Sequence, residues 1–210
     1  MKIQKPKRQK TLPRYETFEA ALEGERYIQG ALFENMTISN LMIDRLNLNQ
    51  CHFRKVVFEN CEFHKIDMSD TTFENCDLSQ LYLGGGSVFR CEFLNTRLVG
   101  VDFADSVIRE TTVDSCSAAY LNAGFTKMKS VMFKETKLQD SRFIEAKMEK
   151  VAFIDSDLKY ADFTNTNLKA LDFSSCDIEQ LTLSLNLIKG LTLNQEQALM
   201  IAKELGLNIV

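Results

Sequence analysis

Apolar residues recur at every fifth position from Phe33 to Leu193, without an insertion, through 33 consecutive pentads. A helix repeats every 3.6 residues and a strand every two, so a period of five fits neither. The residue two before each centre is also small or apolar, as at Ala31, Cys51 and Cys61. This pair forms a very short inward strand, and the other three residues turn a corner. Because single coils bury little, the pattern predicts a stacked solenoid.

A superperiod of twenty residues predicts four sides in each coil. Sorted by that spacing, two columns of central residues ten positions apart hold 11 Phe among 17 positions, and the other two columns hold one among 16. Phenylalanines should therefore stack from coil to coil at the ~4.8 Å strand spacing, giving a rod roughly 40 Å long. The first column supplies the predicted core stack: Phe33, Phe53, Phe73, Phe93, Phe133, Phe153 and Phe173.

Several pentads follow the motif Ala/Cys–Asp/Asn–Leu/Phe–x–x, among them Cys76-Asp77-Leu78, Ala161-Asp162-Phe163 and Cys176-Asp177-Ile178. This pattern resembles the pentapeptide-repeat family over most of the chain. The resemblance implies an all-β solenoid, a right-handed quadrilateral β-helix of about eight coils over residues 26–193.

Residues 1–25 are predicted to form a flexible basic tail and a possible capping segment. The tail carries Lys2, Lys5, Lys7, Arg8, Lys10 and Arg14 together with both prolines. A solvated tail and a tail that contacts nucleic acid or a partner are both consistent with this composition. Residues 15–24 could add one short helix over the first coil.

Residues 194–210 are predicted to form a C-terminal module. Asn194 is a suitable N-cap for a helix from Gln195 to Leu205, and Gly206 is a suitable stop. Its apolar positions are predicted to cover the open edge of the last coil and to form a homodimer: Ala198, Ile201, Ala202, Leu205 and Leu207.

Two stretches depart from the repeat. Gly86 occupies an inward position after Gly84 and Gly85, which predicts a bulge or a bent corner there. Ala118 and Ala123 are the only small central residues, and the thin core predicts that Tyr120 or Phe125 turns inward to fill it.

The candidate chemistry is sparse. All six cysteines fall two residues before a centre, which predicts buried free thiols and a reducing, cytoplasmic compartment. The two histidines, His52 and His64, fall at outward positions, so no shared site is expected. We therefore predict no catalytic residues, no metal, no cofactor and no membrane segment.

Charge is the remaining signal, because residues 31–118 carry 13 acidic and 7 basic side chains within a chain of net charge −4. A negative rod is not expected to bind nucleic acid directly. The candidate partner-binding residues are the acidic ones: Asp70, Glu74, Asp77, Asp102, Asp105, Glu110 and Asp114.

The stretch Cys116-Ser117-Ala118-Ala119-Tyr120 and the close Leu205-Gly206-Leu207 are similar to the Qnr-type and MfpA-type quinolone-resistance branch of that family. The resemblance implies a cytoplasmic, DNA-mimicking homodimer that binds DNA gyrase, and possibly topoisomerase IV, and protects it from fluoroquinolones. The unbroken register leaves no room for projecting loops, as in the loop-free Gram-positive chromosomal members. Two alternatives stay open: a β-helical scaffold for another protein, and an immunity protein against a gyrase-directed toxin.

Overall fold

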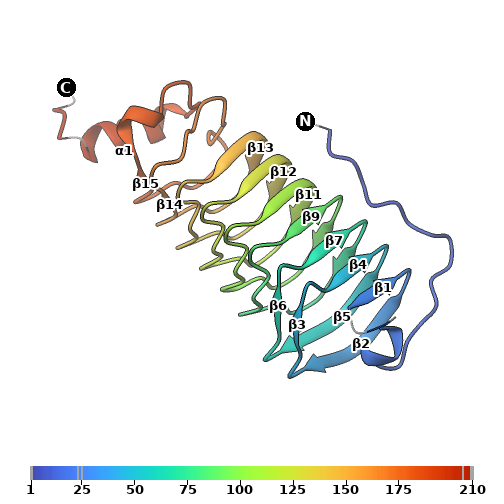
Figure 1. The fold of residues 1–210 in the computed structure, drawn as a ribbon. Coiled ribbons are helices and arrows are strands. Elements are labelled where there is room, and N and C mark those ends of the chain that lie inside the picture. The colour runs from blue at the N-terminus through green and yellow to red at the C-terminus, as the bar shows by residue number, and fades with distance from the viewer. Residues whose placement is uncertain (1, 23, 25, 205, 209–210) are drawn as a thin grey trace.

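The chain forms a four-sided β-solenoid of about eight coils that ends in a single α-helix (Figure 1). This computed structural model describes residues 2–22, 24, 26–204 and 206–208. We number the sides 1 to 4 by their central residues in the first coil, which are Phe33, Ile38, Ile43 and Leu48; each side recurs every twenty residues. The predicted fold class is confirmed.

The strands are short, and several run around a corner to serve two sides. Their bounds are β1 Tyr27–Gln29, β2 Leu32–Ser39, β3 Met42–Asp44, β4 Asn47–Asn49, β5 His52–Glu59, β6 Glu62–His64, β7 Asp67–Ser69, β8 Thr72–Glu74, β9 Ser87–Phe89, β10 Glu92–Leu94, β11 Val107–Asp114, β12 Lys127–Lys134, β13 Lys147–Ile154, β14 Asp162–Phe163 and β15 Thr182–Leu183. The helix α1 spans Gln195–Glu204, and two 3₁₀ turns span Glu19–Ala21 and Leu185–Leu187.

Every strand pair is parallel and offset by twenty residues, as with Phe33 opposite Phe53 and Phe133 opposite Phe153. The register does not slip at the glycine run, where Val88 lies opposite Met68. Of the two predicted alternatives, the bulge is wrong and the bent corner is present, since Gly85 has a φ of 71°. Gly86 is needed for a different reason: a Cβ on it would lie 2.2 Å from the carbonyl oxygen of Ile66 in the coil below.

The corners have one backbone geometry. All 27 described non-glycine residues with positive φ lie at sequence positions divisible by five, and their φ angles run from 48° to 66°. This left-handed region is unfavourable for most side chains and is tolerated best by Gly and Asn. The corners bend the chain four times per coil, so the coil's shape comes from repeated local strain that inter-coil pairing stabilises.

The core is a column of rings. Phe33, Phe53 and Phe73 stack at centroid distances of 4.8 Å, and Phe133 and Phe153 stack at 5.0 Å. The column is interrupted on side 1 at position 113, where valine stands. A cavity of about 20 Å³ remains there, lined by apolar side chains and Thr111.

The prediction that an aromatic side chain fills the thin core is wrong. Tyr120 and Phe125 occupy corners with φ of 61° and 58°, and their side chains point outward. A corner residue in the left-handed region directs its side chain away from the rod, so the short central Ala118 and Ala123 are simply buried without extra cover.

The cysteine positions are buried, as predicted, and have a further role. Cys76 Sγ donates to the carbonyl oxygens of Phe53 and Glu74 at 3.4 Å, and Thr96 in the next coil makes the same two kinds of contact. Small donors at this position therefore satisfy carbonyls that face the core. Burial raises the pKa of the Cys91 thiol to about 12 and that of Cys51 to about 11.

Both ends of the column are covered. Phe18 packs on the first coil, with its ring 5.4 Å from that of Phe33, and the 3₁₀ turn Glu19–Ala21 follows it, where the sequence predicts a possible capping segment. At the other end Asn194 and Gln197 form a reciprocal capping box, with bonds of 2.8 and 2.9 Å. The buried amide of Gln197 also donates to the carbonyl oxygens of Phe173 and Cys176.

Candidate functional site

The seven predicted acidic residues do not share one face of the rod. Glu74 and Asp114 lie on side 1, Asp77 on side 2 and Asp102 on side 3. Their positions in the pentads follow different columns of the twenty-residue coil, which the overall charge count conceals. Corner positions hold the other three residues: Asp105 between sides 3 and 4, and Asp70 and Glu110 between sides 4 and 1.

Basic side chains neutralise the acidic residues of sides 1 and 2. Glu74 accepts from Arg54 Nε at 3.2 Å, and the same arginine reaches Glu34 in the coil below. Asp77 pairs with Arg97 at 3.4 Å. The ladder along side 1 continues higher up, where Lys134 lies 3.7 Å from a carboxylate oxygen of Asp114. Such exposed pairs contribute up to ~1 kcal/mol each and leave little free negative charge.

The N-terminal tail covers the corner between sides 4 and 1. Residues 2–14 run back along the outside of the rod (Figure 1). The amide N–H of Gln4 donates to Glu110, that of Lys7 to Asp70, and Arg8 pairs with Glu92 at 2.6 Å. The tail that the sequence predicts to be flexible therefore lies against the rod through these contacts. Sequence reasoning missed Glu92, which pairs with Arg8 84 positions away and belongs to no local motif.

Asp70 is the most strongly held of these carboxylates. It is 5% exposed and forms two 2.7 Å bonds to the guanidinium of Arg90. Burial by itself raises the pKa of Asp70, but the bonds from Arg90 and from the Lys7 amide outweigh it and hold the pKa below its ordinary value. Asp70 is thus a charged anchor at physiological pH.

Side 3 differs from the others because its acidic residues lie beside exposed rings. Asp102 accepts only neutral donors, from the Ala104 amide and Asn122, and no cationic side chain in the described ranges pairs with it or with Asp105. Tyr120 is 62% exposed and Phe125 is 53% exposed. The rings and carboxylates frame the same side of the middle coils.

The two edges of side 3 alternate rings and carboxylates at successive coils. The edge shared with side 2 carries Tyr120, Asp140 and Tyr160, and the edge shared with side 4 carries Asp105, Phe125 and Glu145. Between the edges the outward positions include small residues at 104 and 124. We call this area the aromatic–acidic surface: Asp102, Asp105, Tyr120, Phe125, Asp140 and Tyr160.

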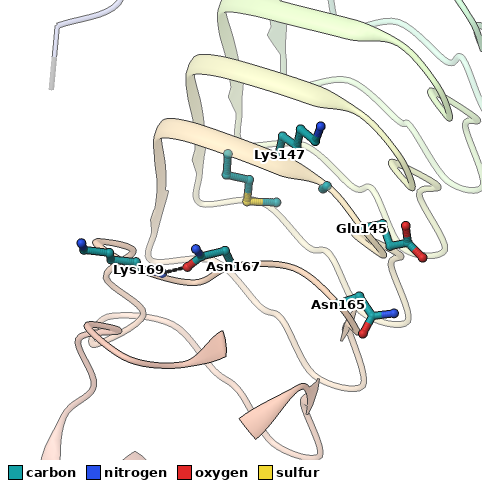
Figure 2. Close-up of a pocket in the computed structure, with 7 residues that line it drawn as sticks. Glu145, Lys147, Asn165, Asn167 and Lys169 are labelled. Atoms are coloured by element: carbon teal, nitrogen blue, oxygen red, sulfur yellow. Dashed lines mark hydrogen bonds between the residues drawn. The ribbon is translucent and has the colours of Figure 1, made fainter. Parts of the chain in front are cut away.

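Side 4 carries the opposite charge in the same half of the rod. Its outward residues include Arg109, Lys127, Lys129, Lys147, Lys169 and Lys189. An open hollow of about 700 Å³ lies on it, and Figure 2 shows Lys147, Asn165, Asn167, Lys169 and Glu145 around its rim. The side chain of Asn167 is held by the Lys169 amide at 3.0 Å. Basic side chains therefore gather on side 4 in the upper coils, where Glu149 pairs with one of them, Lys129, at 2.7 Å.

None of the described groups of His, Cys, Asp and Glu forms a cluster of three or more that could hold a metal ion. His52 bonds to Glu74, and His64 bonds to Glu62 on another side. Nor is any helix in residues 2–22, 24, 26–204 or 206–208 both long and apolar enough to cross a membrane.

The predicted dimerisation residues divide into two groups. Ile201 packs against the core as part of the end cover, and Ala202 is half-buried beside it. Ala198 is exposed, and Leu207 is 59% exposed. Leu205 lies outside the described residues. Leu199, which the sequence interpretation did not include, adds a further exposed apolar side chain on α1.

Comparison with known proteins places this architecture in a family. The family model described as "Pentapeptide repeat region" matches residues 46–123 and 125–199. The uncharacterized protein YisX of Bacillus subtilis is 32% identical over 127 residues, which cover 60% of this chain and 59% of that protein. The matched part thus spans less than two thirds of YisX.

Solved structures give weaker similarities. A trypsin-treated form of QnrB1, described as a plasmid-mediated fluoroquinolone resistance protein, is 21% identical with a TM-score of 0.49, covering 88% of this chain and 98% of that one. HetL of the cyanobacterium Nostoc sp., a protein involved in heterocyst differentiation regulation, is 12% identical with a TM-score of 0.31, covering 82% and 93%.

Proposed function

Because the chain belongs to the pentapeptide-repeat family, whose solenoids are generally structural or protein-binding scaffolds, we propose that it is a non-enzymatic, cytoplasmic protein that binds a type II topoisomerase. DNA gyrase is the preferred partner and topoisomerase IV the second. In this proposal the rod occupies a surface that otherwise holds DNA and thereby relieves inhibition by fluoroquinolones, as the sequence resemblance implies.

The observation that carries the proposal is the aromatic–acidic surface. A topoisomerase binds DNA through a basic surface, since phosphate contacts come mainly from Arg and Lys. Asp102 and Asp105 offer carboxylates that no basic side chain in the described chain neutralises. The rings of Tyr120 and Phe125 beside them can receive cationic groups on their faces. Exposed tyrosines are also among the residues that most often dominate interface energies.

Local charge, rather than total charge, must provide the mimicry. Duplex DNA carries about one charge per 1.7 Å of axis, or about 24 over a 40 Å rod. The acidic and basic residues between positions 31 and 118 differ by only six. Sides 1 and 2 pair their charges and side 4 carries many basic side chains, so the free carboxylates nearest to one another are those of side 3 in the middle coils, below Arg142.

We place dimerisation at the C-terminal end, as the sequence suggested. Leu199 is exposed on α1 between Gln197 and Ile201, the two residues that contact the last coil, and the exposed Leu207 follows the helix. A two-fold axis here would make one long rod from two. Leu207→Glu should give a monomer by light scattering, whereas Asn208→Glu, a neighbouring exposed position, should leave the oligomeric state unchanged. Equal masses for both variants would remove this segment from the interface.

The function is tested by gyrase supercoiling in the presence of ciprofloxacin, with the purified protein titrated in. We expect supercoiling to recover with the wild-type chain. Phe125→Asn and Tyr120→Asn should each require at least tenfold more protein, because hot-spot side chains are lost. Asparagine tolerates the left-handed corner, so neither variant should lose thermal stability.

The control is Ser115→Asn, which also places asparagine at a left-handed corner, but on a different edge of the rod and without removing a ring. It should protect gyrase as well as the wild type does. If all three variants protect equally, the aromatic–acidic surface is not the contact. If the folded wild-type chain neither protects nor inhibits gyrase, the scaffold alternative replaces this proposal, and partner capture follows.

A further inference from the structure

We propose that the N-terminal tail is a self-bound ligand and that the groove beneath it is a binding site for an extended basic segment of another protein. The tail groove is formed by Gln50, Asp70, Thr72, Glu92 and Glu110. The inference does not rest on the proposed function, because the tail groove lies on a different edge of the rod from the aromatic–acidic surface.

The groove binds the tail partly through its main-chain N–H groups, which any extended peptide other than at proline also has. The main-chain N–H groups of Gln4 and Lys7 donate to Glu110 and Asp70, each at 2.9 Å. Gln9 follows Gln4 by five positions, while their partners Gln50 and Glu110 are three coils apart. An extended chain covers about 16 Å in five residues, and three coil spacings amount to about 14 Å. An extended segment therefore matches the spacing of the coils.

One side chain supplies most of the charge recognition. Arg8 pairs with Glu92 at 2.6 Å and also reaches the hydroxyl of Thr72. Glu92 has a side chain only 10% exposed, and Arg8 is the cation that pairs with it among the described residues. Asp70, by contrast, keeps Arg90 whether or not the tail is present. A vacated groove thus leaves the Glu92 carboxylate without its cation, and a replacement arginine from elsewhere could restore the same charge-assisted bond.

The tail is held lightly compared with the rest of the chain. Between residues 2 and 12 only Pro6 is buried, and the lysines at 2, 5, 7 and 10 are exposed. A hollow of about 190 Å³ remains between the tail and the rod, beside Arg8, Gln50 and Thr72. Few apolar contacts and incomplete packing mark segments that open at low free-energy cost. The tail can therefore be exchanged without unfolding the coils.

Competition by the tail should weaken binding of any outside peptide. A tethered segment acts at an effective concentration in the millimolar range for a short linker. Weakening the contacts of the tail should therefore raise the apparent affinity of the tail groove for a peptide in solution. The gain equals the factor by which the fraction of molecules with an empty groove increases. The occupant we commit to is a basic, extended protein segment with at least one arginine.

The experiment measures binding of a fluorescein-labelled peptide with the sequence of residues 2–12 to the full chain, by anisotropy at low ionic strength. The proteins are the wild type, Arg8→Ala, and Arg8→Ala combined with Glu92→Gln. Arg45→Ala serves as the matched control, since it removes an exposed arginine from a corner between sides 3 and 4. Thermal melting confirms that each chain is folded.

We expect Arg8→Ala to bind the peptide at least tenfold more tightly than the wild type and Arg45→Ala to match the wild type. Adding Glu92→Gln should reverse the gain at least tenfold. Trypsin should cleave after Lys10 faster in Arg8→Ala, and excess unlabelled peptide should speed that cleavage in the wild type. Equal peptide affinity of the wild type and Arg8→Ala, or an unchanged affinity on adding Glu92→Gln, would overturn the proposal and leave the tail as a fixed strap. Because no topoisomerase is present, failure here leaves the gyrase assay unaffected.

Discussion

Replacing Gly86 by alanine tests whether the coils are as tightly spaced as the structure requires. The added Cβ would lie 2.2 Å from the carbonyl oxygen of Ile66 and 2.8 Å from its nitrogen. These are backbone atoms of the coil below, so no side chain can rotate to make room. The φ angle of Gly86 is not in the left-handed region, and the cost therefore comes from contact alone.

The size of the effect follows from the shift that the contact demands. An ordinary separation of 3.4 Å requires the two coils to part locally by about 1.2 Å. The 2.8 Å bond from the Ser87 amide to the Ile66 carbonyl would then be lost. Losing that bond costs about 1 kcal/mol, and overpacking adds roughly 1–3 kcal/mol. We expect the free energy of unfolding to fall by about 2–4 kcal/mol, which corresponds to roughly 10 °C in the melting temperature.

The chain contains its own control in Gly124→Ala, at a position where the new Cβ would meet no atom closer than 3.4 Å. That substitution should be neutral or stabilise by about 0.4–1 kcal/mol, because alanine restricts the unfolded chain. Both variants are compared with the wild type by thermal and urea unfolding, followed by circular dichroism. The reasoning fails if Gly86→Ala melts with the wild type, or if both alanines destabilise equally.

Three further predictions concern groups described above. Burial raises the thiol pKa of Cys51 and Cys91 above the 9.0 of an exposed thiol, so these thiols ionise at lower pH in the unfolded chain than in the folded one. The stability toward urea should therefore fall as the pH rises from about 9 toward 11, and Cys91→Thr should reduce that fall. Gln197→Ala should cost about 2–3 kcal/mol in thermal unfolding by leaving the carbonyl of Phe173 and its neighbour unbonded, and a change within error would contradict the capping role. Burial opposes the charge of Asp70, but its bonds lower the pKa, so its stabilisation is present above about pH 4 and is lost on further acidification; Asp70→Asn should flatten that acid limb of the stability curve.

The repeat made the fold readable from sequence. A spacing of twenty between phenylalanines fixed in advance which residues would be neighbours, and Phe33, Phe53 and Phe73 do lie in one ladder. The same spacing of twenty places Glu34, Arg54 and Glu74 in one ladder of alternating charge. In a periodic structure the neighbours of a residue follow from its number, and the residues at inward positions need only be of types that can be buried.

The candidate site was harder to predict from the sequence, because several of its contacts do not follow the twenty-residue repeat. Nothing local in the tail indicates that Arg8 meets Glu92 rather than solvent. Tyr120 or Phe125 was expected inside because the core layer is thin there, yet the corner geometry directs both side chains outward. Counting acidic residues along the chain concealed that Asp102 and Asp77 face different sides, although sorting them by the twenty-residue period does show it.

The uniform offset of twenty residues also determines which insertions and deletions the molecule can accept. Removing one residue within the rod would turn outward side chains inward in every later coil, whereas removing twenty would shorten the rod by one layer, about 4.8 Å, with each side intact. The tail adds a restriction, because its contacts at Gln50 and Glu110 span three layers. Inserting or deleting whole coils is therefore least disruptive on the C-terminal side of Glu110. Between Gln50 and Glu110 the number of coils must match the length of the tail that lies on them.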